Sequence, residues 1–389
     1  MRYSPLVEVF HGEGAEAWRI HDEARKRQQA GEDVILLSVG DPDFPTPEPI
    51  VEAAVRALRS GDTHYSDIPG RPHLRDAIAR EFSAAQGRTL AREEVIVGAG
   101  AQNVLFSTGL CLLGPGDEVI VLEPMYVTYE ATLRASGATL RRVAMTAESG
   151  FRPDPAALRA AVNERTRAIV LTTPNNPTGV VLAAEELEAI AAIARAHDLW
   201  VVVDEVYAAL AFERPHVSIA SLPGMAERTV TIGSLSKSHA MTGWRVGWAI
   251  APADFTDHVE RLELSMLYGL PGFVQEAAAA GFDDYRGTTE AMRARYRARR
   301  DLVVDALKDT PGLRVLAPEA GMFVLVDVRA TGLSSEDFAW RLLREAGVST
   351  LDAGAFGPTT RGFLRMSFTL DEADLARACQ RIDGFMRRL

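Results

Sequence analysis

The sequence contains few cysteines, no long hydrophobic run and no excess of basic residues, and each of these absences excludes a class of protein. Its two cysteines, Cys111 and Cys379, lie far apart in no metal-like spacing, which favours a reduced cytoplasmic protein over a disulfide-rich or zinc-binding one. No apolar run approaches the ~18 residues of a membrane span, and the first residues lack the layout of a signal peptide. The net charge of −11 argues against a nucleic-acid surface. We therefore expect no nucleic-acid, membrane or metal partner.

Hydrophobic residues make up 47% of the 389 residues, which is enough to bury at least one large core and to form two domains. Between about residues 90 and 250, short runs rich in β-branched residues alternate with helix-like stretches such as 183–198. Continuous apolar runs of this kind are typical of strands buried on both faces. The alternation predicts a mostly parallel α/β sheet with strands near 93–100, 117–124, 166–174, 199–207, 228–236 and 245–252.

The character of the sequence changes after about residue 285. Residues 289–309 have the pattern of one long amphipathic helix. The residues that follow them alternate between strands and helices that carry charged residues on one face. Residues 12–31 have the pattern of an N-terminal helix. We therefore predict an N-terminal segment over 1–45 that packs with the small domain, a large ligand-binding domain over 46–285, and a small α+β domain over 286–389.

Candidate site residues follow the predicted strands, because ligands of an open parallel sheet bind beyond the carboxyl ends of its strands. Gly100, Ala101 and Gln102 lead from a strand into a helix whose N-terminus could hold a phosphate, although a plain tight turn explains them equally well. Tyr126 could lie over a planar ligand or could simply pack. Asn176 lies in a segment that also fits an ordinary loop.

Asp204 gives a stronger signal than these, because it ends the apolar strand "VVVD". A carboxylate at the end of a buried strand is costly unless it meets a cation. Tyr207 follows three residues later and directs a phenol toward the same end of the sheet. These two residues favour a ligand site over a purely structural role.

The segment "SLSKSHAMTGWRVGW" (234–248) completes the set. Burial and neighbouring cations favour the neutral amine of Lys237, which is the form that condenses with an aldehyde. Ser234, Ser236 and Arg245 supply hydroxyls and a forked guanidinium that suit a phosphate dianion. An aldehyde-binding lysine, a carboxylate for a ring nitrogen and phosphate donors together predict pyridoxal 5'-phosphate as the cofactor.

At this point the chain resembles the fold-type I aminotransferases of the aspartate aminotransferase superfamily, class I and II. The resemblance covers essentially the whole length. It rests on eight segments in order: "SVGDPDFPTP" (38–47), "THYSDIPGRPHLRDAIA" (63–79), "GAGAQNVL" (98–105), "EPMYVTY" (123–129), "TPNNPTG" (173–179), "DEVY" (204–207), "SLSKSHAMTGWRVGW" (234–248) and "LRMSF" (364–368). It implies a large domain with a mostly parallel seven-stranded sheet flanked by helices, a smaller α+β domain, and a homodimer with shared active sites.

The resemblance also implies a role for each matching residue. Lys237 would bind the cofactor covalently and move the substrate proton, Asp204 would contact the pyridinium nitrogen, and Asn176 with Tyr207 would donate to the phenolate oxygen. Arg365 would clamp the substrate α-carboxylate, helped by Asn176 and the backbone of Gly40. The remaining matches are the stacked ring and the phosphate ligands, namely Tyr126, Gly100, Ala101, Gln102, Ser234, Ser236, Arg245 and, from the neighbouring subunit, Tyr65.

Within the family, segments such as "MRYS", "GDTHY", "SMLYG" and "GMFVLVD" are similar to those of arginine–pyruvate transaminases. This similarity implies L-arginine as amino donor and pyruvate as acceptor. Glu16 and Asp41 are candidate partners for a guanidinium, and Trp18 and Tyr268 are candidate walls of the substrate site. No second arginine for a distal carboxylate is evident near "SMLYG", so we expect aspartate to be the poorer donor.

Alternatives remain at this stage. A β-eliminating carbon–sulfur lyase would use the same cofactor site, and an aspartate- or aromatic-specific aminotransferase would share every motif. A ligand-sensing domain of a transcriptional regulator is a remote alternative, because such proteins carry a basic DNA-binding module ahead of this pattern, which here begins near residue 30. The motifs favour amino transfer over elimination.

Overall fold

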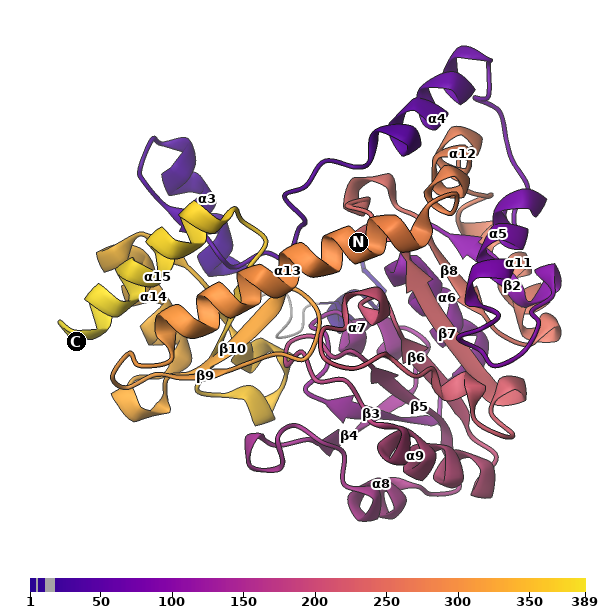
Figure 1. Cartoon of the computed structure of the whole chain (residues 1–389). Helices are drawn as coiled ribbons and strands as arrows, with labels where there is room; N and C mark the ends of the chain where they lie inside the picture. Colours follow the sequence, from indigo (N-terminus) through magenta and orange to yellow (C-terminus); the bar gives the residue numbers. More distant parts are fainter. Residues whose placement is uncertain (5, 11–17) are drawn as a thin grey trace.

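The computed structural model of the chain describes residues 1–4, 6–10 and 18–389, and Figure 1 shows that the described chain is built around two sheet regions joined by the long helix α13. The larger sheet has the strand order β2-β8-β7-β6-β5-β3-β4. All neighbouring strands are parallel except β8, which runs antiparallel to β2 and β7. This confirms the predicted mostly parallel, seven-stranded sheet, whose strands are β2 (Val95–Gly98), β3 (Glu118–Glu123), β4 (Thr139–Ala144), β5 (Thr166–Thr172), β6 (Trp200–Asp204), β7 (Thr229–Ser234) and β8 (Gly247–Ile250).

The central strands have continuous apolar sequences because helices cover both faces of the sheet. In β5, Ile169 and Leu171 pack in one core cluster, whereas Ala168 and Val170 pack in another on the opposite face. This is the alternation that a strand with two buried faces produces. The helices of this region are α4 (Glu48–Arg59), α5 (Pro72–Phe82), α6 (Ala101–Leu112), α7 (Tyr129–Arg134), α8 (Pro155–Ala161), α9 (Ala184–Ala196), α10 (Leu235–Ser238), α11 (Ala253–Met266) and α12 (Gly272–Gly281).

A four-stranded antiparallel sheet forms the second region, with the order β12-β13-β10-β9. Helix α13 (Tyr285–Leu307) confirms the predicted long helix, and its C-terminal part packs against α15 beside this sheet (Figure 1). The other elements are β9 (Arg314–Leu316), β10 (Phe323–Asp327), α14 (Ser335–Ala346), β11 (Val348–Ser349), β12 (Leu351–Asp352), β13 (Phe363–Ser367) and α15 (Glu372–Met386).

The N-terminal segment joins this second region. Helix α3 (Arg19–Gln29) packs on α14, and β1 (Ile35–Leu36) pairs in parallel with β11. The short helix α1 (Leu6–Val9) precedes them, while residues 12–17 of the predicted N-terminal helix lie outside the described residues. The domain boundaries at 45/46 and 285/286 stay a prediction.

Within the described part of the chain, no helix has the length and apolar character needed to cross a membrane. The polar loops that follow β3, β5, β6 and β7 instead converge at one edge of the large sheet, where they face β10 and β13 of the smaller one. The fold therefore gathers most of the predicted site residues at the boundary between the two sheet regions.

Candidate active site

A cavity of ≈ 680 Å³ lies at this boundary. Its wall combines the carboxyl ends of parallel strands with residues of α3, the segment after β1, β10 and β13. The polar and aromatic residues that line it are Trp18, His21, Arg25, Gln28, Asp41, Gln102, Tyr126, Thr128, Tyr129, Thr172, Asn176, Asp204, Tyr207, Ser234, Ser236, Lys237, Thr242, Arg245, Phe323 and Arg365. The cavity thus brings together most of the residues predicted from sequence.

Lys237 is the cavity's only lysine among the described residues, and the chain has just two others, Lys26 and Lys308, which are both exposed. It lies on the short helix α10, directly after β7, and its Nζ donates to the carbonyl oxygen of Gly40 at 2.8 Å. Burial lowers the pKa of the Lys237 amine to about 8. The negative charge of the nearby Asp41 carboxylate raises this pKa and so offsets part of the effect of burial. The neutral, nucleophilic form of this amine is therefore the minor form near neutral pH, but it is much more populated than in an exposed lysine.

Asp204 ends β6 and extends into the cavity. Its carboxylate accepts hydrogen bonds from the Tyr129 hydroxyl at 2.5 Å and from the Val206 amide at 3.1 Å. Burial raises the pKa of Asp204, while these hydrogen bonds act in the opposite direction. Among the described residues, Lys237 is the cation whose positive charge lowers the pKa of Asp204, but no ion pair joins the two side chains.

Asn176 and Tyr207 meet beside Asp204. The Asn176 amide nitrogen lies 3.4 Å from the Tyr207 hydroxyl, and both side chains are buried. Burial raises the pKa of Tyr207 far above its usual value, so the phenol stays protonated. The pair therefore offers an amide N–H and a phenol O–H, two donors suited to an anionic oxygen.

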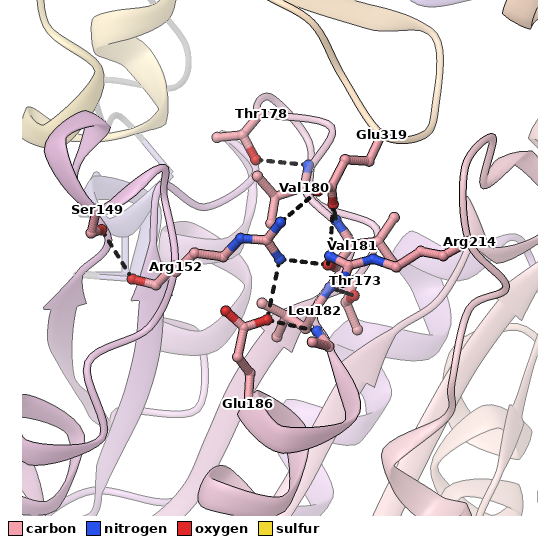
Figure 2. Close-up of polar contacts among 11 residues, drawn as sticks. Ser149, Arg152, Thr173, Thr178, Val180, Val181, Leu182, Glu186, Arg214 and Glu319 are labelled. Carbon is pink, nitrogen blue, oxygen red and sulfur yellow. Dashed lines mark hydrogen bonds and ion pairs between the residues drawn. The ribbon is translucent and has the colours of Figure 1, made fainter.

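The loop that carries Asn176 is fixed by the polar network drawn in Figure 2. Arg152 donates to the carbonyl oxygen of Val181 (2.6 Å) and to Glu319 (2.6 Å), which also accepts the Val181 amide at 2.8 Å. Arg214 approaches the other side of the same carboxylate at 3.0 Å. Because Glu319 lies between β9 and β10, this network ties the Asn176 loop to the second sheet region.

The predicted phosphate ligands surround the N-terminus of α6. Gly100 caps this helix with a positive φ of 87°, and a side chain there would collide with the guanidinium of Arg245. Ser234 caps α10 by accepting from the Ser236 amide at 3.0 Å. The Gln102 side chain forms hydrogen bonds with Thr128 and Thr132. The backbone N–H of Gln102, in the first turn of α6, is therefore the group of this residue that can donate to an anion. Free helix N–H groups, hydroxyls and an arginine form a cradle for a phosphate.

Arg365 is the most deeply buried charge in the cavity, with 2% of its surface exposed. It lies in β13, donates to the carbonyl oxygen of Ser38 at 2.7 Å, and packs 4.1 Å from the centre of the Phe323 ring. Its Nε has no hydrogen-bond partner, and burial lowers the pKa of the guanidinium to about 10. Within the described chain no carboxylate forms an ion pair with it. A cation buried without a counter-charge is costly in free energy, and an anionic ligand would offset this cost.

The remaining predicted residues divide into two groups. Trp18, Gly40, Asp41, Ala101 and Tyr126 line the cavity. Tyr65 and Tyr268 do not line it; their rings pack against each other at an angle of 55° with ring centres 4.7 Å apart, and Tyr65 is 86% exposed. Glu16 lies outside the described residues.

Several cavity residues were not predicted. Tyr129 donates to Asp204, and His21 bonds the Ser38 hydroxyl at 2.8 Å. Phe323 packs against Arg365. The segment "EPMYVTYE" holds two tyrosines that both follow β3, so Tyr129 could have been considered beside Tyr126 as a residue beyond the carboxyl end of this strand. Nothing in the local sequence marks His21 or Phe323, because their contacts are with residues distant in the chain.

Comparison with known proteins agrees with this geometry. Residues 32–382 match the family model described as aminotransferase class I and II. The chain belongs to the class I and II aminotransferases. An arginine–pyruvate transaminase of Pseudomonas aeruginosa is 52% identical over 382 residues, which cover 98% of this chain and 97% of that protein. An aspartate/prephenate aminotransferase of Thermus thermophilus is 37% identical over 95% of both chains.

Solved aminotransferase structures have the same fold. A Thermus thermophilus aspartate aminotransferase variant complexed with tryptophan superposes with a TM-score of 0.93 at 36% identity and covers 100% of both chains. An aromatic aminotransferase of Pyrococcus horikoshii gives a TM-score of 0.88 at 35% identity, over 94% of this chain and 99% of that one. The chain is thus an aminotransferase of fold type I, an enzyme that acts on amino and 2-oxo acids.

Proposed function

We propose that this aminotransferase holds pyridoxal 5'-phosphate on Lys237 and moves an amino group from an L-amino acid to a 2-oxo acid in a ping-pong cycle, with L-arginine and pyruvate as a favoured pair. The observation that carries the cofactor assignment is the partly buried Lys237, whose amine has a pKa lowered to about 8. It lies in one cavity with a carboxylate, two donors and a phosphate cradle. This donor set matches the groups of the cofactor one by one.

The residues present fit this cofactor. When bound, pyridoxal 5'-phosphate supplies an aldehyde that condenses with amines and a ring that withdraws electrons from the substrate carbon. In the proposal Asp204 keeps the proton on the ring nitrogen, and Asn176 with Tyr207 donates to the phenolate oxygen. The α6 N-terminus, Ser234, Ser236 and Arg245 bind the phosphate.

The substrate is held by the opposite wall of the cavity. Arg365 binds the α-carboxylate through its fork, because its guanidinium is buried without a carboxylate among the described residues. Once the substrate amine has displaced it from the cofactor, the Lys237 Nζ would act as the base that moves a proton from the substrate α-carbon to C4′ of the cofactor. It would move a proton in the opposite direction when the 2-oxo acid is converted to its amino acid. The β-eliminating alternative receives no support from the relatives named above, which are a transaminase and an aminotransferase.

The arginine–pyruvate assignment rests on the 52% identity to the Pseudomonas aeruginosa enzyme. Among the described residues, the cavity contains one carboxylate besides Asp204, that of Asp41. Asp41 accepts a hydrogen bond from Thr242 through a single oxygen, Oδ1, at 2.6 Å. Of the two predicted partners for a guanidinium, Asp41 is the one that lies among the described residues, and it would offset the cost of an unpaired cation in the cavity.

We also propose a homodimer in the cytoplasm. The exposed Tyr65 and Tyr268 pair suits contact with a second copy, in which Tyr65 would reach the phosphate of the neighbouring site. The two cysteines, Cys111 and Cys379, are unpaired, as expected of a reducing compartment. Sedimentation of the wild type and of Tyr65→Ala tests the assembly: we expect dimers for both, with weaker cofactor binding in the variant. A monomeric wild type would exclude shared sites.

Borohydride reduction followed by peptide mapping tests the cofactor assignment. The purified protein should be yellow, bleach on reduction and carry the reduced adduct on the Lys237 peptide. Lys26 and Lys308 serve as internal controls, because they are exposed and should stay unmodified. Lys237→Ala should fold, remain colourless and lose turnover. An adduct on either control lysine would contradict the proposal.

A panel of amino donors with pyruvate as acceptor tests the substrate assignment. L-arginine should give the highest kcat/KM and yield 2-ketoarginine and alanine. If aspartate or an aromatic amino acid exceeds arginine tenfold, which corresponds to about 1.4 kcal/mol of transition-state preference, then the arginine assignment is wrong. The aminotransferase assignment would survive that result.

A further inference from the structure

Residues 37–46, here named the strap, cross the cavity without forming a helix or strand. At one end the strap contacts the second sheet region: the Ser367 amide donates to the carbonyl oxygen of Leu37 (2.7 Å) and Arg365 donates to that of Ser38 (2.7 Å). At the other end Thr46 donates to the carbonyl oxygen of Ala240 at 2.7 Å. The strap therefore links both sheet regions across the site.

The middle of the strap touches the reacting groups. The carbonyl oxygen of Gly40 accepts from the Lys237 amine, and a side chain at Gly40 would overlap the Phe323 ring. Asp41 accepts from Thr242. Because irregular backbone has no ladder of hydrogen bonds to fix it, side-chain anchors set the position of these carbonyl groups.

Arg299 of α13 is the deepest anchor of the strap. Its side chain is completely buried, and its two terminal nitrogens donate to the two carboxylate oxygens of Asp43 at 2.7 and 2.9 Å. Its Nε lies 3.2 Å from Glu372, and its guanidinium packs 4.5 Å from the centre of the Phe44 ring. Such a two-bond contact fixes the orientation of Asp43 as well as its distance.

The link from this anchor to the site is short and stiff. Asp43 is three residues from Gly40, and Pro42 between them fixes one backbone dihedral. We propose that Arg299 is a positioning residue that, through Asp43, holds the strap so that Ser38 orients Arg365 and Gly40 contacts Lys237. The proposal rests on the function proposed above, and it adds to that function a residue that itself touches neither the cavity nor its ligands.

Arg300 provides a matched control for Arg299. It is the next residue of α13, is 8% exposed, and contacts Glu213 at 2.8 Å and the carbonyl oxygen of Pro318 at 3.1 Å. None of these partners belongs to the strap. A role of Arg299 that is merely structural should therefore appear equally in Arg300→Lys.

The kinetic test compares Arg299→Lys, Arg300→Lys and Asp43→Asn in the cofactor-loaded enzyme. Arg299→Lys keeps the charge but loses the fork, so we expect KM for both amino acid and 2-oxo acid to rise at least tenfold, with a smaller change in kcat. Asp43→Asn should act in the same direction. Arg300→Lys should leave both constants within twofold at a similar loss of thermal stability. Equal KM values for Arg299→Lys and Arg300→Lys would overturn the proposal.

A second readout needs no cofactor and no turnover. Amine labelling of the cofactor-free protein, followed peptide by peptide, reports the pH at which Lys237 becomes reactive. A displaced strap admits water to Lys237, so its midpoint should move upward in Arg299→Lys and stay unchanged in Arg300→Lys. An unchanged midpoint in both variants would overturn the positioning role even if the wild type proved inactive, whereas an inactive wild type with a shifted midpoint would contradict only the proposed function.

Discussion

Two arginines in the second sheet region are almost completely buried, yet their surroundings differ. Arg299 on α13 has a two-bond ion pair with Asp43 and a second contact with Glu372. Arg365 on β13 donates to the carbonyl oxygen of Ser38 and, at 3.4 Å, to the amide oxygen of Asn176, and its guanidinium packs against aromatic ring faces. Its Nε has no partner, and it forms no ion pair within the described chain. Burial lowers the pKa of Arg365, whereas the carboxylates beside Arg299 outweigh burial and raise its pKa.

The difference shows how a structural cation can be told from a ligand-binding one. A buried charge that lacks a counter-charge costs free energy, and a fold retains it when a ligand completes the pair. Arg299 has its carboxylate partners within the folded chain and, in our proposal, holds the strap in position. Arg365 lacks a carboxylate partner among the described residues, and its forked guanidinium fits an α-carboxylate.

Replacing Arg365 by methionine should have the largest effect on activity. Removing one partner of a buried, hydrogen-bonded charge pair costs about 2–5 kcal/mol, so kcat/KM should fall by roughly thirtyfold or more. The free energy of unfolding should stay the same or rise, because an uncompensated cation leaves the interior. Steady-state kinetics and urea unfolding measure the two quantities. A variant that loses stability as Arg299→Met does would erase the distinction between the two arginines.

Arg299→Met should show the opposite balance, with the larger effect on stability. It leaves the Asp43 carboxylate without its partner, and breaking a buried pair costs about 3–5 kcal/mol of unfolding free energy. The lower end applies here, because the Asp43 side chain is 27% exposed. Urea unfolding of Arg299→Met and of Arg299→Met combined with Asp43→Leu checks this. Recovery of stability in the double variant is expected, and no loss in the single variant would contradict the pairing.

Arg365→Lys should have an intermediate effect that isolates geometry from charge. The lysine keeps a cation in the pocket but loses the planar fork, so KM should rise by roughly tenfold for both amino acid and 2-oxo acid. The kinetic measurement should include a substrate with a different side chain, whose KM should rise by the same factor. A rise confined to one side chain would move Arg365 from carboxylate binding to side-chain binding.

The smallest expected effect is a difference in pH midpoint between two lysines. Burial lowers the pKa of Lys237 to about 8, so its neutral, reactive fraction rises as the pH increases through 8. The exposed Lys308 has its pKa raised by a hydrogen bond to Asp305, so it should react only at higher pH. Amine labelling of the cofactor-free protein across the alkaline range measures both midpoints. Coincident midpoints would show that Lys237 is not desolvated.

The sequence predicted the large sheet and much of the site for a physical reason. Asp204 and Lys237 follow apolar strands almost directly, so local pattern alone places them at one edge of a parallel sheet. Arg365 came instead from the resemblance, because an arginine within a strand carries no local signal of a ligand. Its unpartnered Nε became apparent only when β13, the strap and Phe323 were seen together.

Other features required contacts between distant residues. The hydrogen bonds of Arg299 to Asp43 join residues 256 apart in the chain. The His21 ring bonds the hydroxyl of Ser38, and most of α3 and all of β1 lie between these two residues in the sequence. The placement of Tyr65 and Tyr268 away from the cavity of their own chain also depends on tertiary structure. Residue type and spacing do not determine such pairs, because many side chains of the same type occur along the sequence.

Equilibrium binding of pyruvate tests most directly whether a ligand carboxylate is the missing partner of Arg365. Pyruvate and its uncharged methyl ester would be titrated into cofactor-loaded wild type and into Arg365→Met. Contacting groups are coupled, so removing either charge should weaken binding by roughly a hundredfold, and removing both should weaken it no further. If Arg365→Met binds pyruvate within twofold of the wild type, the carboxylate lies elsewhere and the interpretation of this buried arginine is wrong.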